Sequence, residues 1–274
     1  MSAINMGKKQ DTGTAPSGWG CGDCRLRNRC LPSGLNTEQT EALDQVVVHN
    51  RSLERHGAVC RSGSAFRFLY AIRSGFVKST VGQADGRDQV TGVYMAGDLI
   101  GMDGIGSGNY VCDLVALEDS NICAIPFADL QRLSRDIPPL QRHLHGLLSR
   151  ELARSYEVML VLGSMHIEER IALFLLDLSQ RYASRGASPT QFNILLTRHE
   201  IGSYLGARLE TVSRVLSRFQ DEGLIHIQHK VVEIKDLERL SRAVTARSEA
   251  YRETFRRPLP SANPSAERTQ PSYA

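Results

Sequence analysis

The hydrophobic pattern of the chain changes several times between its two polar ends. Residues 37–48 predict a short amphipathic helix with Thr37 as its cap. From about 58 to 127, short apolar runs such as "FRFLYAIRSG" and "RDQVTGVYMAGD" alternate with Gly, Asp and Asn. Short apolar runs separated by such turn residues predict an antiparallel sandwich or barrel. Helical periods follow over 138–163, which opens on two prolines, and over 166–185.

The helix predicted over 138–163 carries a stripe with the spacing of a coiled-coil seam. Its members follow one another at steps of 4, 3, 4 and 3 residues: Leu148, Leu152, Ser155, Met159 and Leu162. A stripe this short fits two interpretations equally well. The helix packs on the core of its own domain, or it joins two copies of the chain as a dimerisation helix.

The stretch from 195 to 234 has the order of elements of a winged helix-turn-helix. Thr197 and Glu200 form a T-x-x-E capping box before a short helix. Gly206 permits a tight turn, a second helix is predicted over 209–221, and Gly223 ends it. The alternating "IHIQHKVVEI" then predicts a two-stranded wing. Two helices joined by a short turn with glycine are typical of this DNA-binding motif.

In such a motif the start of the second helix meets base edges in the major groove. The candidate base-reading residues are Leu209, Glu210, Ser213 and Arg214. Arginine pairs with guanine and glutamate accepts from cytosine. Arg208 and Arg218 are candidates for phosphate contacts, which position the protein without reading sequence. The alternative is an ordinary solvated helix face, because acids nearly balance bases in this region.

Composition bounds the class of protein. The 274 residues carry a net charge of +3, and 41% of them are hydrophobic, which is ordinary for a globular chain. No apolar run reaches the ~18 residues of a transmembrane helix, and residues 1–20 lack the apolar core of a signal peptide. We therefore expect a cytoplasmic protein without a membrane partner. Residues 1–20 and 247–274 are polar and unpatterned, so they predict disordered or flexible ends.

Three of the six cysteines fall within "CGDCRLRNRC", residues 21–30. In a reducing compartment such a cluster favours metal ligands or redox groups over disulfides. Cys60 and Cys112 stand alone among apolar neighbours and are interpreted as small buried hydrophobes.

The order of these segments resembles the CRP/FNR family of bacterial transcription regulators, in particular its oxygen-sensing fumarate-nitrate reduction branch. The resemblance covers about residues 21 to 240 and is carried by "CGDCRLRNRC", "LYAIRSG", "MAGDLIGMDGIGSG", "ALEDSNICAIPF", "EERIALFLLDLS" and "YLGARLETVSRVLSRFQ". It implies an α+β chain with a cyclic-nucleotide-binding-like β-roll, a long dimerisation helix and a C-terminal winged helix-turn-helix. The expected boundaries are 21–135 for the cluster segment and sensor domain, 136–163 for the dimerisation helix and 164–246 for the DNA-binding domain, followed by the tail at 247–274.

The resemblance also implies a [4Fe-4S] cofactor held by Cys21, Cys24, Cys30 and Cys123. In that branch oxygen destroys or converts the cluster, the dimer loosens and DNA is released. Four cysteines also suit a structural zinc site, so a zinc-stabilised DNA-binding regulator without sensing is the alternative. A cluster-based redox protein is a third interpretation, disfavoured by the helix-turn-helix. No nucleophile–base pair is recognisable, so the chain is not expected to be an enzyme.

Further implied partners are double-stranded DNA with TTGAT-type inverted repeats, a second copy of the chain, and RNA polymerase. The nearest match to a polymerase contact is the expected hairpin turn of Asp85, Gly86, Arg87 and Asp88. A cyclic nucleotide is not expected, because no arginine lies between Met95 and Val111 to pair with its phosphate.

Three departures from the family pattern stand out. Ser155 replaces an acidic residue in the seam, which predicts a dimer that persists more readily without its cluster. Arg25 and Arg29 lie between ligands where the branch has smaller or apolar residues, and positive charge there is expected to raise the cluster potential. Arg208 stands where Ser or Thr would cap the recognition helix.

Overall fold

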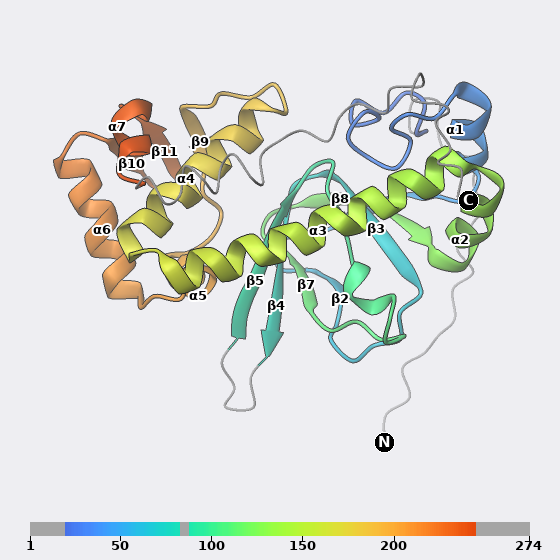
Figure 1. Ribbon diagram of the computed structural model, residues 1–274, viewed down its shortest axis with the longest axis horizontal. Helices are drawn as coiled ribbons and strands as arrows, with labels where there is room; N and C mark the ends of the chain where they lie inside the picture. Colours follow the sequence, from blue (N-terminus) through green and yellow to red (C-terminus); the bar gives the residue numbers. More distant parts are fainter. Residues whose placement is uncertain (1–19, 83–87, 245–274) are drawn as a thin grey trace, which may run out of the picture. The chain divides into compact units, whose positions relative to one another are not determined.

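The computed structural model describes residues 20–82 and 88–244 (Figure 1). Contacts divide them into two compact units. The first runs to Leu152 and includes Ile194–Thr211, and the second combines Ala153–Asn193 with the chain from Val212 on. Two helices, α3 (Pro138–Ser164) and α6 (Leu209–Asp221), contribute residues to both units.

The first unit is built on a β-roll of two four-stranded antiparallel sheets, ordered β1-β8-β3-β6 and β2-β7-β4-β5. This confirms the predicted antiparallel sandwich. The strands are β1 (Val48–Leu53), β2 (Ala58–Cys60), β3 (Phe68–Ser74), β4 (Phe76–Gly82), β5 (Asp88–Met95), β6 (Leu99–Ile100), β7 (Asp113–Ala116) and β8 (Ser120–Pro126), with a short 3-10 helix η1 at Met102–Gly104.

The period-two alternation of strand residues explains why the sheet of β3 and β8 has a hydrophobic core on each face. Tyr70 and Ile72 of β3 lie in the core between the two sheets, together with Ile122 of β8. Leu69 and Ala71 point the other way, into a second core. That second core is closed by helices α1 (Thr37–Asp44), α2 (Phe127–Asp136) and the start of α3.

Two sequence expectations for this unit are corrected. The first helix is capped by Asn36 rather than Thr37. The Asn36 side chain accepts from the Gln39 amide at 2.8 Å, and the Gln39 side chain accepts from the Asn36 amide at 3.1 Å. The helix also ends at Asp44, not near residue 48, because Val48 already starts β1. The sequence reading also missed helix α2, whose apolar residues follow directly on those of β8.

Helix α3 has 27 residues, which makes it about 40 Å long. The predicted span of 138–163 is confirmed to within one residue. The remaining elements are α4 (Ile167–Ala183), β9 (Gln191–Asn193), α5 (Arg198–Leu205), α6, β10 (Ile225–Gln228), β11 (Val231–Ile234) and α7 (Leu237–Arg242). The predicted wing is confirmed as β10 paired with β11, and β9 adds a third strand that the sequence reading missed.

The second unit packs around the apolar face of α4, where Ile171 and Leu175 are fully buried. Helix α6 contributes four buried side chains at helical spacing: Val212, Val215, Leu216 and Phe219. Helix α7 packs against α4 and buries Leu240. No helix among the described residues is long and apolar enough to cross a membrane.

Candidate functional site

The three N-terminal cysteines lie on a coil of tight turns that folds back on itself. The amide of Cys30 donates to the Leu26 carbonyl at 3.0 Å, and the Arg27 amide donates to the Cys24 carbonyl at 2.9 Å. Leu31, next in the chain, is 1% exposed and anchors the coil in the core under α1. The coil therefore presents its cysteines to the outer face of the β3–β8 sheet.

Cys123 meets this coil because of its place in strand β8. It pairs with Ala71 of β3, and its neighbours Ile122 and Ala124 face the core of the roll. Alternation turns Cys123 to the opposite face, where it packs on the same core as Cys21 and Cys30. A single hollow is lined by all four of the residues Cys21, Cys24, Cys30 and Cys123.

Two arginines also line this hollow, and they are not those that the sequence singled out. Arg27 and Arg73 contribute to its wall, whereas Arg25 and Arg29 are exposed and do not. Arg73 lies at the end of β3 in the "LYAIRSG" segment. Only the folding of the coil against β3 brings its charge near the cysteines.

The surroundings keep the Cys21 and Cys30 thiols protonated. Burial raises the pKa of Cys30 to about 12. The pKa of Cys21 is also raised, first by burial and then by the Asp44 carboxylate, which accepts the Cys21 amide at 2.7 Å. Ligand cysteines must lose these protons when a metal binds. Assembly of a metal centre here is thus coupled to proton release.

The four thiols of this hollow are a donor set that both a [4Fe-4S] cluster and a structural zinc ion use. Within residues 20–82 and 88–244, no three His, Cys, Asp or Glu side chains are grouped so as to hold one metal ion. A structural zinc site needs four ligands converging tetrahedrally at about 2.0 to 2.3 Å. A [4Fe-4S] cluster uses four thiolates, one per iron, and therefore suits thiols arranged around a hollow.

The cysteine coil is also joined to helix α3. The backbone of Cys30 lies by His143 of this helix and acts to raise the pKa of the imidazole, whose Nε2 is buried without a hydrogen-bond partner. Burial and the charge of Arg150 lower the pKa of His143. Leu140 and Leu144 of the same helix are buried in the core that contains Cys30. The sequence reading missed His143, since no local pattern connects it to residue 30.

Farther along α3, large apolar side chains face outward. Leu152 is 54% exposed and Met159 59%, as expected for members of a seam. Tyr156 and Leu160 are exposed beside them and widen the stripe beyond the predicted residues. Ser155 is exposed, whereas Leu148 and Leu162 are half-buried.

The helix-turn-helix follows the sequence prediction closely. Thr197 and Glu200 form the predicted capping box of α5. Gly206 ends that helix with φ of 65°, a left-handed conformation that glycine adopts without strain. Gly202 is required for the turn, because a Cβ there would lie 2.5 Å from the Ala207 carbonyl oxygen.

The candidate DNA-reading residues stay at the surface of α6. Glu210 and Arg214 are exposed, Leu209 is 42% exposed and Ser213 is half-buried. Arg208 is exposed just before the helix. Arg218 instead forms an ion pair with Glu168 at 2.5 Å, so a phosphate would compete with that carboxylate. Asp85, Gly86 and Arg87 lie outside the described residues, and Asp88 starts β5.

A β-roll, a long helix with an apolar outer stripe and a winged helix-turn-helix together define a DNA-binding transcription regulator. Residues 50–136 match the cyclic nucleotide-binding domain family and residues 169–243 the Crp-like helix-turn-helix domain family. The chain is 38% identical to the transcriptional regulatory protein btr of Bordetella pertussis over 84% of its own length and 95% of that protein.

It is also 38% identical to the fumarate and nitrate reduction regulatory protein of Escherichia coli, covering 81% of this chain and 88% of that one. The solved structure of FixK2 from Bradyrhizobium japonicum aligns with a TM-score of 0.66 at 26% identity, over 73% of this chain and 98% of the other. The chain belongs to the CRP/FNR family of transcription regulators. Its relatives regulate transcription and are not enzymes, as expected.

Proposed function

We propose that the chain is an oxygen-responsive regulator that holds a [4Fe-4S] cluster through Cys21, Cys24, Cys30 and Cys123. The observation that carries the proposal is the hollow lined by these four cysteines and by no other cysteine of the described residues. When bound, the cluster supplies a group that oxygen oxidises. The protein residues would hold the thiolates together, shield them, and place Cys30 beside His143 of α3.

The output of this sensor is DNA binding by a homodimer. The exposed stripe of α3 is the proposed dimer seam, formed by Leu148, Leu152, Ser155, Met159 and Leu162, with Tyr156 and Leu160 beside it. Glu210, Ser213 and Arg214 are the proposed readers of TTGAT-type inverted repeats, and Leu209 is placed to contact a thymine methyl. Low oxygen favours the cluster-bound, DNA-binding dimer, which controls anaerobic gene expression.

Two further points about partners belong to the proposal. RNA polymerase is the proposed target of the β4–β5 turn, of which only Asp88 is described. The β-roll is proposed not to use a cyclic nucleotide, because Met95–Val111 contains no arginine. In addition, Tyr70 and Tyr110 are both 4% exposed and fill the core of the roll with stacked rings.

The deciding experiment is anaerobic purification with iron, acid-labile sulfide and zinc measured before and after exposure to air. Binding to a duplex with a TTGAT inverted repeat is followed on the same samples. The proposal expects about four irons per chain and joint loss of colour and DNA affinity in air. Cys123→Ala should abolish the cluster, while the matched control Cys112→Ala should retain it.

Other outcomes would contradict the proposal in different ways. Zinc without acid-labile sulfide would show that residues 21–30 hold a structural zinc ion, and the proposal of oxygen sensing would then be wrong. Loss of colour with unchanged DNA affinity would leave a real cluster that is uncoupled from α6.

A further inference from the structure

The first helix of the helix-turn-helix motif is docked on the β-roll. Strand β5 is the edge strand of the sheet β2-β7-β4-β5, and helix α5 packs against it. Both belong to the first compact unit. Edge strands present unpaired N–H and C=O groups that proteins commonly cover. Here the covering element is part of the DNA-binding motif.

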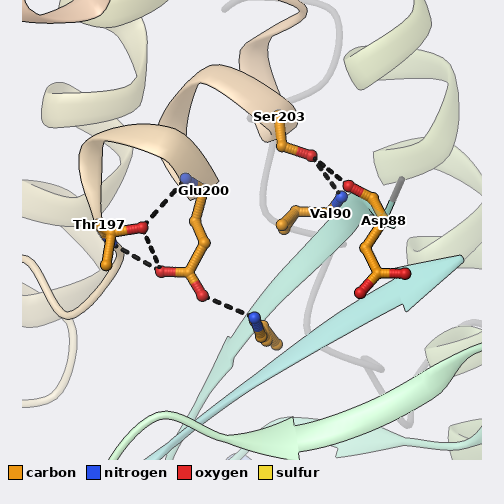
Figure 2. A network of polar contacts seen from close by, with 6 residues as sticks. Asp88, Val90, Thr197, Glu200 and Ser203 are labelled. Carbon is orange, nitrogen blue, oxygen red and sulfur yellow. Dashed lines mark hydrogen bonds and ion pairs between the residues drawn. The ribbon is translucent and has the colours of Figure 1, made fainter. Parts of the chain in front are cut away.

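Ser203 of α5 pairs with the free edge of β5 (Figure 2). Its hydroxyl donates to the Asp88 carbonyl at 3.0 Å and accepts from the Val90 amide at 2.9 Å. One side chain thus satisfies a donor and an acceptor of the strand, as a neighbouring strand would. The Gln89 side chain in turn donates to the Ser203 carbonyl.

An ion pair secures the same contact. Nζ of Lys78, on strand β4, lies 2.6 Å from Oε1 of Glu200. The side chains are only 19% and 17% exposed, so this pair is largely shielded from water, unlike an ordinary surface pair. The other oxygen of Glu200 accepts from the Thr197 amide at 2.7 Å and hydroxyl at 2.8 Å, as Figure 2 shows. One carboxylate therefore caps α5 and fastens it to the roll.

The docked arrangement leaves the reading end of α6 open. Only Gly206, Ala207 and Arg208 separate α5 from α6, so the position of α5 limits where α6 begins. Glu210 and Arg214 remain exposed while Lys78 and Glu200 are paired. The contact is thus compatible with base reading at the start of α6.

We propose that Lys78 and Ser203 are positioning residues for DNA binding, which hold α5 on the β4–β5 edge so that α6 is presented in a fixed orientation. A dimer must place two reading helices about 34 Å apart along the duplex. A recognition helix that is already held in one orientation loses less orientational freedom on binding DNA than a mobile helix does. The contact strengthens DNA binding without touching DNA.

The test compares Lys78→Met and Ser203→Ala with the conservative variants Lys78→Arg and Ser203→Thr. Arg61→Met, which breaks the exposed Arg61–Asp113 pair of the same roll, is the matched control. Dissociation constants are measured on a TTGAT-repeat duplex and on a mixed-sequence duplex at low salt. Hydrogen exchange of the residue 88–95 amides reports docking directly.

We expect Lys78→Met, which removes one charge-assisted hydrogen bond, and Ser203→Ala, which removes two neutral ones, each to weaken binding about ten-fold and to speed exchange in β5. The conservative variants should restore both readouts, and the control should change neither. The salt dependence of binding should stay as in the wild type, because Lys78 neutralises no phosphate.

Unchanged affinity in both variants would overturn the proposal. Tighter binding would also overturn it, since the contact would then be inhibitory. A salt slope reduced by about one in Lys78→Met would show a direct phosphate contact instead of positioning. All variants are compared with the wild type in the same cluster state, so these outcomes separate failure of the α5 contact from failure of the cluster proposal.

Discussion

At the scale of single residues, the neighbours of a cysteine distinguish the proposed metal ligands from the cysteines of the core. Cys60 is 9% exposed between the sheets, and its Sγ lies 4.0 Å from the Cys112 carbonyl oxygen. Cys21 and Cys30 are also shielded, yet they share a hollow with two further cysteines and two arginines. The thiols are chemically alike, so their different roles follow from their neighbours.

The buried thiol of Cys60 is expected to make the folded protein less stable at alkaline pH. Burial, followed by the charge of Asp103, raises its pKa from 9.0 to about 12. Because the pKa of Cys60 is higher in the folded chain than in the unfolded chain, its contribution to the free energy of unfolding is full below pH 9. This contribution is lost as the pH rises toward 12. The free energy of unfolding should therefore fall above pH 9, by at most ~1.4 kcal/mol per pH unit from this group. Urea unfolding from pH 7.5 to 10.5 should show a shallower fall in Cys60→Ala, and parallel curves would contradict this origin.

Arg73 is expected to tune the proposed cluster. A positive charge in the wall of the hollow favours the more reduced state, so Arg73→Met should lower the reduction potential by roughly some tens of millivolts. Loss of the visible absorbance in air should then be faster than in the wild type. Arg29→Met is the matched control, because Arg29 is exposed and outside the lining. If Arg29→Met changes the rate as much as Arg73→Met, the lining residues have no special effect.

At the scale of elements, α3 and α6 show that apolar residues at the same helical spacing can be buried in one segment and exposed in another. Helix α6 buries every large apolar residue of its stripe and leaves its polar face free. Helix α3 buries its N-terminal stripe at Leu140 and Leu144 but exposes Leu152 and Met159. The same spacing therefore marks a core contact in one segment and an unpartnered face in the other.

The proposed seam on α3 predicts a dimer that persists more readily without its cluster than one with an acidic residue at position 155. Ser155 places no charge on the two-fold axis of a dimer, whereas Ser155→Asp would place two carboxylates near each other. We expect the cluster-free dimer of Ser155→Asp to dissociate about five-fold more readily, near 1 kcal/mol. Sedimentation of the wild type, Ser155→Asp and the neutral control Ser155→Asn measures this. Equal dimer dissociation constants in all three proteins would contradict this prediction.

The reading end of α6 predicts separate effects on specificity and on salt dependence. Arg214→Ala should cost about 1–3 kcal/mol on a TTGAT repeat and relax discrimination at one base position. Arg208→Ala, a change of the same charge two residues before Glu210, should weaken binding to all duplexes and reduce the salt slope by ~1. Titrations at several salt concentrations on matched and mutated repeats separate the two. A uniform loss in Arg214→Ala would assign that residue to phosphate.

At the scale of the whole molecule, one core joins the cysteine coil, the β-roll and the start of α3. Leu31 of the coil, Ile125 of β8 and Leu140 of α3 are each buried in it. A close-packed core transmits small displacements because its side chains have little free volume. We therefore expect a change at the cysteines to displace the helix that carries the proposed dimer seam.

His143 is expected to carry part of this coupling, because it lies on α3 beside the backbone of Cys30. His143→Leu should reduce the ratio of cluster-free to cluster-bound dimer dissociation constants by about five-fold, the effect of one hydrogen bond of ~1 kcal/mol. His145→Leu, on an exposed position of the same helix, is the matched control and should keep the ratio. The ratio comes from sedimentation of anaerobic and air-exposed samples. Equal ratios in wild type and His143→Leu would exclude this route.

Much of the fold was predictable from local pattern. The wing, α3, the capping box at Thr197 and the span of α6 follow from side-chain period, caps and glycines. The cap of α1 was misplaced by one residue because Asn36 and Thr37 are both good caps and only backbone geometry distinguishes them. The ligand set came from a family resemblance, since nothing local ties Cys123 to residue 30.

The sequence by itself determined which elements form and which faces are apolar, because period, caps and turn residues act over a few neighbouring positions. The tertiary structure alone decided which distant side chains meet. Cys123 faces the coil because of strand alternation in β8, and Arg73 lines the hollow where Arg25 does not. Lys78 and Glu200, 122 residues apart, pair because an edge strand and a helix share one unit. Such contacts depend on how sheets and helices pack, and packing energy is summed over the whole chain.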